Sequence, residues 1–189
     1  MNFYARGFNL ILLLAVLLNG CASDSKKKKG FLGTLRIHIE SRGNLPGEGG
    51  NLPNTGADLP DTVKQVKVLR ADPVKVNIVP DSILSEQNML SVRLVETPGG
   101  GDAIKIKFDE QGGWTLEQYA AADPGAHFVI FGQWDKNPED GRWLAAPLIN
   151  RRIADGTLTF TPDCSHEEAQ KLVSSVNRSI EKIQTGSLK

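Results

Sequence analysis

The stretch that decides the fold is "AIKIKFDEQGGWTLEQYAAADPGAHFVIF", residues 103–131. Apolar and charged residues alternate over 103–108, which is the period of a strand with one buried face. A short helix is predicted over 114–122, because the Asp-Pro-Gly at 123–125 stops it. The mostly apolar run at 127–134 then predicts a central strand. The stretch therefore predicts a strand, a helix and a second strand.

Further strand patterns lie on both sides of this stretch. They occupy residues 35–39, 63–70, 74–79, 91–96 and 142–149, with a helical turn at 84–90 that Ser85 can cap. Pro73 parts the second pattern from the third, and the Asp-Gly pair at 155–156 marks a tight turn before "TLTF". His38 falls on the polar side of its strand, so we expect it to be solvated.

The last element is a long helix with a clear start. Ser165 and Glu168 have the spacing of a capping box, and Gly186 can end the helix. Its apolar stripe consists of Ala169, Leu172, Val173, Val176, Ile180 and Ile183. Strands with helices after them predict an α+β fold, a mostly antiparallel sheet with helices packed on one face.

The N-terminus has the pattern of a secretory signal. Arg6 precedes an apolar block at 8–18, which has about 11 residues against the roughly 20 of a spanning helix. Residues 18–21, Leu-Asn-Gly-Cys, resemble the lipobox of bacterial lipoproteins, which implies that Cys21 carries acyl chains such as palmitate and anchors the chain. Ala22 then favours the outer membrane, with the protein facing the periplasm. A plainly cleaved signal and a buried N-terminal helix are the alternatives.

Two segments after the signal are predicted to connect the structured parts of the chain. Four consecutive lysines, 26–29, predict a solvated tether, which could also touch anionic head groups. The Gly- and Pro-rich stretch at 42–61 predicts a long surface loop.

Composition excludes one class of partner. Lysine plus arginine and aspartate plus glutamate number 22 each, so no basic excess favours nucleic acid. The oligomeric state is left open.

No catalytic or metal site is predicted. His38, His127 and His166 lie on different elements without metal-ligand spacing. Cys164 precedes a helix, where its thiolate could be stabilised, but a buried or idle thiol is the preferred interpretation. We therefore expect a protein that is not an enzyme and needs no cofactor or metal.

The tryptophans are the candidate contact residues. Trp114 is expected to begin a helix and pack on the sheet. Trp134 and Trp143 flank a hairpin turn and could pair across it. They are the candidate partner-binding residues, although packing is preferred for both.

The order of motifs over about residues 83–182 resembles the head subdomain of the first large periplasmic domain of SecD, a subunit of bacterial protein export. The matching motifs are "FDEQG" at 108–112, "APLI" at 146–149, and "FT" at 160–161 with "EEA" at 167–169. Two departures limit the likeness: no spanning helix is predicted after the signal, and "QWDKNPEDGR" lengthens the hairpin. The SecD proton pathway therefore does not carry over.

These interpretations combine into one hypothesis. The predicted parts are a signal peptide (1–20), a lipidated tether (21–34), N-terminal strands (35–82) and a SecD-head-like domain (83–185). The resemblance implies a non-catalytic envelope protein that binds a protein or polypeptide partner, with a possible link to export. The alternatives are a structural envelope component with one constitutive partner and an unrecognised enzyme.

Overall fold

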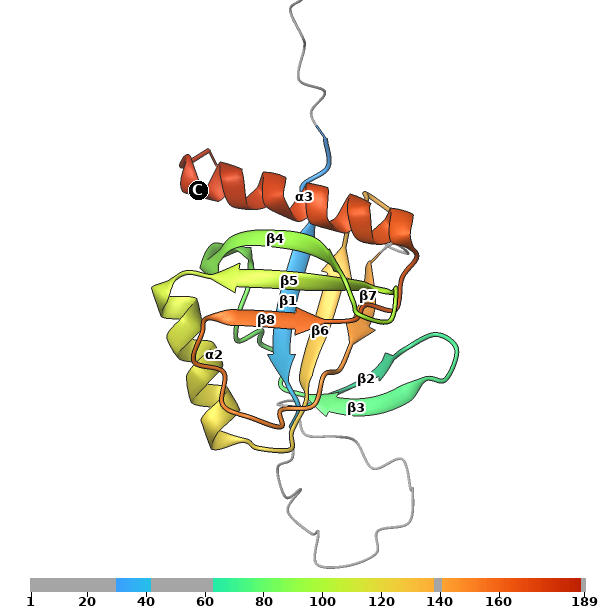
Figure 1. Ribbon diagram of the computed structural model, residues 1–189, viewed down its shortest axis with the longest axis vertical. Coiled ribbons are helices and arrows are strands. Elements are labelled where there is room, and N and C mark those ends of the chain that lie inside the picture. Colours follow the sequence, from blue (N-terminus) through green and yellow to red (C-terminus); the bar gives the residue numbers. More distant parts are fainter. Residues whose placement is uncertain (1–29, 42–62, 138–140, 188–189) are drawn as a thin grey trace, which may run out of the picture.

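The computed structural model describes residues 30–41, 63–137 and 141–187 (Figure 1). The predicted signal peptide, the lipidation site at Cys21, the lysine tether and the loop at 42–61 lie outside the described residues.

The strands form three antiparallel sheets rather than the single sheet that was expected. In sheet order these are β1 (Thr34–Ile39), β6 (Phe128–Gln133) and β7 (Gly141–Ala145); β2 (Lys64–Val68) and β3 (Val74–Ile78); and β4 (Met89–Glu96), β5 (Asp102–Phe108) and β8 (Thr157–Phe160). The helices are the 3₁₀ turn η2 (Glu86–Asn88), α2 (Glu110–Ala122) and α3 (His166–Gln184). The predicted α+β class is confirmed.

The main core lies between the two three-stranded sheets and the helices. Its largest fully buried side chains include Leu35, Ile37, Ile104, Ile106, Leu116, Phe128, Ile130, Leu144 and Leu172. Because β1 pairs with β6 along its whole length, the N-terminal strand shares a sheet and a core with the later region. The predicted division at residue 83 therefore does not mark a break in the fold.

A second, smaller core lies on the other side of the β1–β6–β7 sheet. The β2–β3 hairpin covers this face, and the second core consists of Val66, Val68, Val76, Ile78 and Val129, with Trp143 and Ala146 packed against it. His38 belongs to this face and is only 6% exposed, so the expectation that it is solvated is wrong. Its Nδ1 lies 3.1 Å from the carbonyl oxygen of Val79, and its ring contacts Trp143 edge to face. Strand β1 is therefore buried on its second face at His38, where the hairpin packs on it, whereas Arg36 on the same face is exposed.

Helix α2 begins earlier than expected and exposes its tryptophan. The Asp109 side chain accepts a hydrogen bond from the Gly112 N–H and so caps the helix. Gly112, Leu116 and Ala120 form the buried face of α2. Trp114 lies off this face and is 63% exposed, which contradicts its predicted packing on the sheet.

Helix α3 forms as predicted and also fastens the start of the described chain. The capping box of Ser165 and Glu168 is present. On its buried face, Ser179 donates a hydrogen bond to the Gly33 carbonyl at 2.7 Å, and the Gly33 N–H donates to the Ser175 carbonyl at 3.1 Å. The chain at Gly30–Gly33 therefore leaves the fold beside α3 (Figure 1). Among the described residues, no helix has the length and apolarity to span a bilayer.

Candidate binding groove

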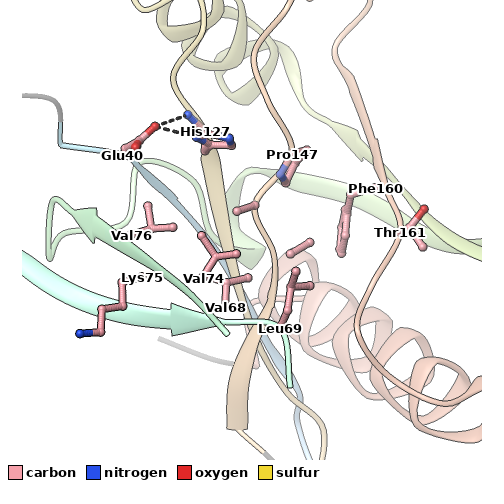
Figure 2. Close-up of a pocket in the computed structure, with 12 residues that line it drawn as sticks. Glu40, Val68, Leu69, Val74, Lys75, Val76, His127, Pro147, Phe160 and Thr161 are labelled. Carbon is pink, nitrogen blue, oxygen red and sulfur yellow. Dashed lines mark hydrogen bonds and ion pairs between the residues drawn. The ribbon is translucent and has the colours of Figure 1, made fainter. Parts of the chain in front are cut away.

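A groove of about 410 Å³ lies between the β2–β3 hairpin and the segments that follow β7 and β8. Its walls are mostly apolar (Figure 2): Val68, Leu69, Val74 and Val76 on the hairpin side, and Ala145, Ala146, Pro147, Phe160 and Thr161 opposite. This volume lies within the range of small-molecule sites, and it can also hold one or two apolar side chains of a partner. We call this hollow the groove.

The hairpin wall of the groove exposes large apolar side chains. Leu69 is 42% exposed and Val74 is 50% exposed. Leu69 also has a φ of +69°, the sole positive value among the described non-glycine residues. A branched side chain in this left-handed conformation is strained by about 1–2 kcal/mol. Strain of this kind is a recognised mark of ligand-binding sites.

One end of the groove is closed by a carboxylate–imidazole pair. Glu40 Oε2 lies 2.7 Å from His127 Nδ1 and also accepts a hydrogen bond from the His127 N–H at 3.0 Å. The carboxylate therefore binds Nδ1 and fixes the ring, which leaves Nε2 for another partner (Figure 2). Such a pair lacks a nucleophile of its own, so this end can bind a polar group but does not form a catalytic triad.

The opposite end of the groove is bordered by charged side chains. The N–H of Arg70, next to Leu69, donates to Asp163 Oδ2 at 2.6 Å, and the Arg70 guanidinium lies 3.6 Å from the same carboxylate. Asp163 follows closely after Thr161 of the opposite wall. These contacts therefore join the tip of the hairpin to the far wall of the groove. The Arg70 side chain is 57% exposed, so the ion pair itself stabilises little.

Neither Trp134 nor Trp143 offers an open contact surface. Trp134 is 5% exposed in the main core, with the Arg142 guanidinium 4.7 Å from its ring. Trp143 is half-buried in the second core between His38 and Phe131. The two rings lie on opposite faces of the sheet, so the predicted pairing across the hairpin is wrong. The exposed tryptophan is Trp114, which lies outside the groove.

The remaining reactive groups do not meet in one site. Burial, with the nearby Glu168 carboxylate, raises the pKa of the Cys164 thiol to about 11, which contradicts a stabilised thiolate. His166 is exposed, and its Nδ1 lies 2.7 Å from Asp102 Oδ2. Within the described ranges, no cluster of His, Cys, Asp and Glu could hold a metal ion.

Sequence reasoning missed the groove. Its walls come from segments far apart in the chain, at Glu40, residues 68–76, His127, residues 145–147 and residues 160–161. The one local indication of the groove was Leu69. This apolar residue breaks the alternation of Val66 and Val68 and lies next to Arg70. The periodic pattern of a strand does not reveal a concave surface between two sheets.

Comparisons with known proteins support the fold. No family model matches the chain, and no curated protein matches it. Two solved SecDF structures match with a TM-score of 0.50, each over 79% of this chain. The fold is SecDF-like. One matched structure is described as a membrane component, SecDF, that enhances protein export. Its sequence is 17% identical to this chain, and the match covers 64% of that SecDF chain. The other matched structure is SecDF in its super-membrane-facing form. Its sequence is 20% identical to this chain, and the match covers 19% of that SecDF chain.

The SecDF likeness concerns the fold alone at these identities. This chain spans less than two thirds of both of these SecDF chains. The resemblance noted in the order of sequence motifs is thus matched by a similar arrangement of helices and strands.

Proposed function

We propose that this chain is a lipid-anchored envelope protein whose SecD-head-like domain binds an extended segment of a polypeptide partner in the groove, without catalysing a reaction. The observation that carries the proposal is the apolar groove with Leu69 and Val74 exposed in its wall. The proposed link to protein export rests on the SecDF-like fold.

The energy for binding would come from apolar burial. Fully burying one Val, Leu or Ile side chain contributes about 1.5–3 kcal/mol. A partner residue in the groove would also cover Leu69 and Val74, so both surfaces lose contact with water. A folded partner offers few such side chains in a protruding form, whereas an extended segment presents them along its length.

The course of the chain is consistent with an anchored domain. Gly30–Gly33 leaves the fold beside α3, and the β2–β3 hairpin lies toward the other end of the molecule (Figure 1). A lipid on Cys21 would therefore attach the domain to the bilayer on its α3 side. A partner in the periplasm could then reach the groove.

The groove is tested with one variant and a matched control. Val74→Asp puts a carboxylate into the apolar wall, and Leu90→Asp makes the same change at a residue of similar exposure, 46%, on β4. The probe is a fluorescently labelled, permanently unfolded polypeptide, and binding is measured by anisotropy. We expect Val74→Asp to weaken binding about tenfold or more, the equivalent of about 1.4 kcal/mol, and Leu90→Asp to leave it unchanged. Equal binding by all three proteins would exclude the groove as the site.

Anchoring is tested separately. In intact cells, the wild-type chain is expected to incorporate labelled fatty acid and to sediment with membranes, and Cys21→Ser is expected to do neither. Crosslinking from position 74 distinguishes the two modes of partner binding. Many different captured chains indicate transient polypeptide binding, whereas one stoichiometric partner indicates the structural alternative.

A further inference from the structure

We propose, building on the polypeptide-binding function, that the partner segment adds as a β-strand to the outer edge of β8. The segment places a large apolar residue in the groove and an acidic residue farther along the same face. The edge concerned is the one that β8 turns away from β5. The inference gives the site of backbone pairing and the chemistry of the partner, which the groove alone does not specify.

The outer edge of β8 has open backbone groups. β8 is the last strand of the sheet β4–β5–β8, so one of its edges has no neighbouring strand (Figure 1). The Phe108 N–H donates to the Gly156 carbonyl, so this pair and every second pair after it exchange hydrogen bonds across the ladder. Thr159, opposite Lys105, lies at one of the alternate positions. Its backbone N–H and carbonyl therefore point away from β5, and they accept or donate no hydrogen bond within the described part of the chain.

Two hollows follow one another along this edge. Phe160 and Thr161 belong to the wall of the groove. Thr157–Thr159 line a second hollow of about 510 Å³, which the segment 147–155 borders on its other side. Pro147 lines both hollows, whereas no residue of β4 or β5 lines either of them. Both hollows therefore lie on the side of β8 that faces away from β5. We call the hollow at Thr157–Thr159 the second hollow.

Two competing sheet edges offer less to a partner strand. The Asn177 side chain covers the outer edge of β4 by bonding both the N–H and the carbonyl of Val92, at 3.0 and 2.7 Å. On the outer edge of β3, the Asn77 carbonyl already accepts the Ser41 N–H at 2.7 Å, which leaves Lys75 beside the groove. An open edge that borders an apolar groove has the form used in β-strand addition.

The pleat of β8 decides which partner side chains enter the hollows. Leu158 and Phe160 point to the buried face of β8, and Thr159 is exposed on the other face. The Phe160 ring lines the groove (Figure 2). A strand added to β8 would continue this pleat, so every second side chain, about 6.6 Å apart, would face the hollows. The partner residue beside Phe160 meets the apolar walls of the groove and should be large and apolar.

Charge in the second hollow selects an acidic residue. Its charged lining residues are Arg151, Arg152 and Asp155. The Asp155 carboxylate accepts the N–H and the hydroxyl of Thr157, at 3.1 and 2.7 Å, and Arg152 is paired with Glu117. Arg151 is exposed and forms no ion pair or hydrogen bond within the described ranges. A partner carboxylate on the same face as the apolar anchor would meet this guanidinium. An edge that is merely solvated predicts no such preference.

The test uses the full chain and capped peptides of about nine residues, a length that matches a strand. The glutamate peptide has a central leucine, glutamate two and four positions away on both sides, and threonine between them, so its pattern is the same in both chain directions. The lysine peptide carries lysine in place of each glutamate. Two further versions of the glutamate peptide are N-methylated, one on the threonine amides and one on the leucine and glutamate amides. Binding is measured by fluorescence anisotropy at low salt.

Four protein variants accompany the peptides. Thr159→Pro removes the outward N–H without removing a bond to β5, and proline is tolerated at such edge positions. Its control, Thr159→Ala, keeps the N–H. Arg151→Glu reverses the charge at the second hollow, and Arg93→Glu makes the same change at an exposed residue of β4, on the other side of the sheet.

We expect Thr159→Pro to weaken binding of the glutamate peptide at least tenfold and Thr159→Ala to leave it unchanged. One of the two methylated peptides should lose binding while the other keeps it, because only one row of amides faces β8. The glutamate peptide should bind at least threefold more tightly than the lysine peptide. Arg151→Glu should reduce or reverse this preference, and Arg93→Glu should keep it.

Thermal unfolding checks that Thr159→Pro is folded, and if it is not, the methylated peptides decide. Equal binding of the two methylated peptides would refute strand addition, and equal binding of the glutamate and lysine peptides would refute the acidic preference. Either result would overturn the inference even if Val74→Asp still showed that the groove binds polypeptide. If neither peptide bound the wild-type chain, the inference would also be wrong, and the groove would be judged on the unfolded polypeptide alone.

Discussion

Arg142 and Glu168 form a two-point ion pair that joins β7 to the first turn of α3. Arg142 Nη2 lies 2.9 Å from Glu168 Oε2, and Nη1 lies 3.3 Å from Oε1. The hydrogen bonds from Arg142 are the main reason that the pKa of Glu168 falls to about 2. Because the same carboxylate accepts the Ser165 N–H, one side chain both caps the helix and holds it against the sheet.

Replacing Glu168 by Gln should lower stability in a pH-dependent way. A carboxylate with a lowered pKa stabilises the fold above its ordinary pKa of 4.5, and this contribution is lost as the pH falls toward about 2. We expect Glu168→Gln to cost about 1–2 kcal/mol at pH 7 and much less near pH 2. Urea unfolding at pH 7, 4 and 2.5 measures this difference. Glu167→Gln, an exposed neighbour, is the control, and a pH-independent cost would contradict the ion-pair explanation.

His38 should make the fold less stable in mild acid. Burial is the main cause that lowers the pKa of His38 below 6.5, so the unfolded chain takes up a proton on this ring at a higher pH than the folded chain does. Its contribution is complete above pH 6.5 and falls as the pH drops below that value, by up to about 1.4 kcal/mol per pH unit. We expect His38→Gln to flatten the stability profile between pH 7 and 5. The decline should persist in His166→Gln, and an unchanged profile in His38→Gln would contradict the assignment.

Gly33→Ala should loosen the chain from α3. A Cβ at Gly33 would lie 2.2 Å from Ser175 Oγ and 2.9 Å from the backbone nitrogen of Val176. Because backbone cannot move aside easily, we expect a loss of about 1–3 kcal/mol in the free energy of unfolding. Gly99→Ala is the matched control, since nothing lies within 4 Å of its added Cβ. Calorimetry that gave the same melting temperature for both variants would show that the Gly33 contact is dispensable.

The Cys164 thiol should react slowly in the folded protein. With its pKa raised to about 11, almost none of it is thiolate at pH 8. In a Cys21→Ser chain, we expect iodoacetamide to modify Cys164 far more slowly than it modifies a free cysteine, and unfolding in urea to remove the difference. Mass spectrometry over time provides the measurement. Native labelling at the rate of free cysteine would contradict the buried environment.

Patterns carried by neighbouring residues were predicted well. The alternation of Ile104, Ile106 and Phe108 identified β5, and the capping box of Ser165 and Glu168 located the start of α3. Helix α2 was predicted four residues short because its true cap, Asp109, precedes two glycines that disfavour helix. Each of these features depends on a few adjacent residues.

Contacts between distant segments were not predicted. His38 was assigned to a solvated face, yet the β2–β3 hairpin covers it. Trp134 and Trp143 looked like neighbours across a turn, but the strand alternation puts their rings in different cores. Trp114 was expected on the sheet and is exposed instead. In each case, another sheet or helix decides the burial of the side chain.

The sequence by itself determined the order of most strands and helices, where α3 begins and the α+β class, because periodicity and capping act over a single turn or a few strand residues. The tertiary structure alone decided that the strands divide into three sheets, that His38 of β1 is buried under the hairpin, and that a groove opens between the hairpin and the far wall. Those features depend on which surfaces meet when distant segments pack together. The spacing of residues along the chain does not show which distant segments will become neighbours in the folded protein.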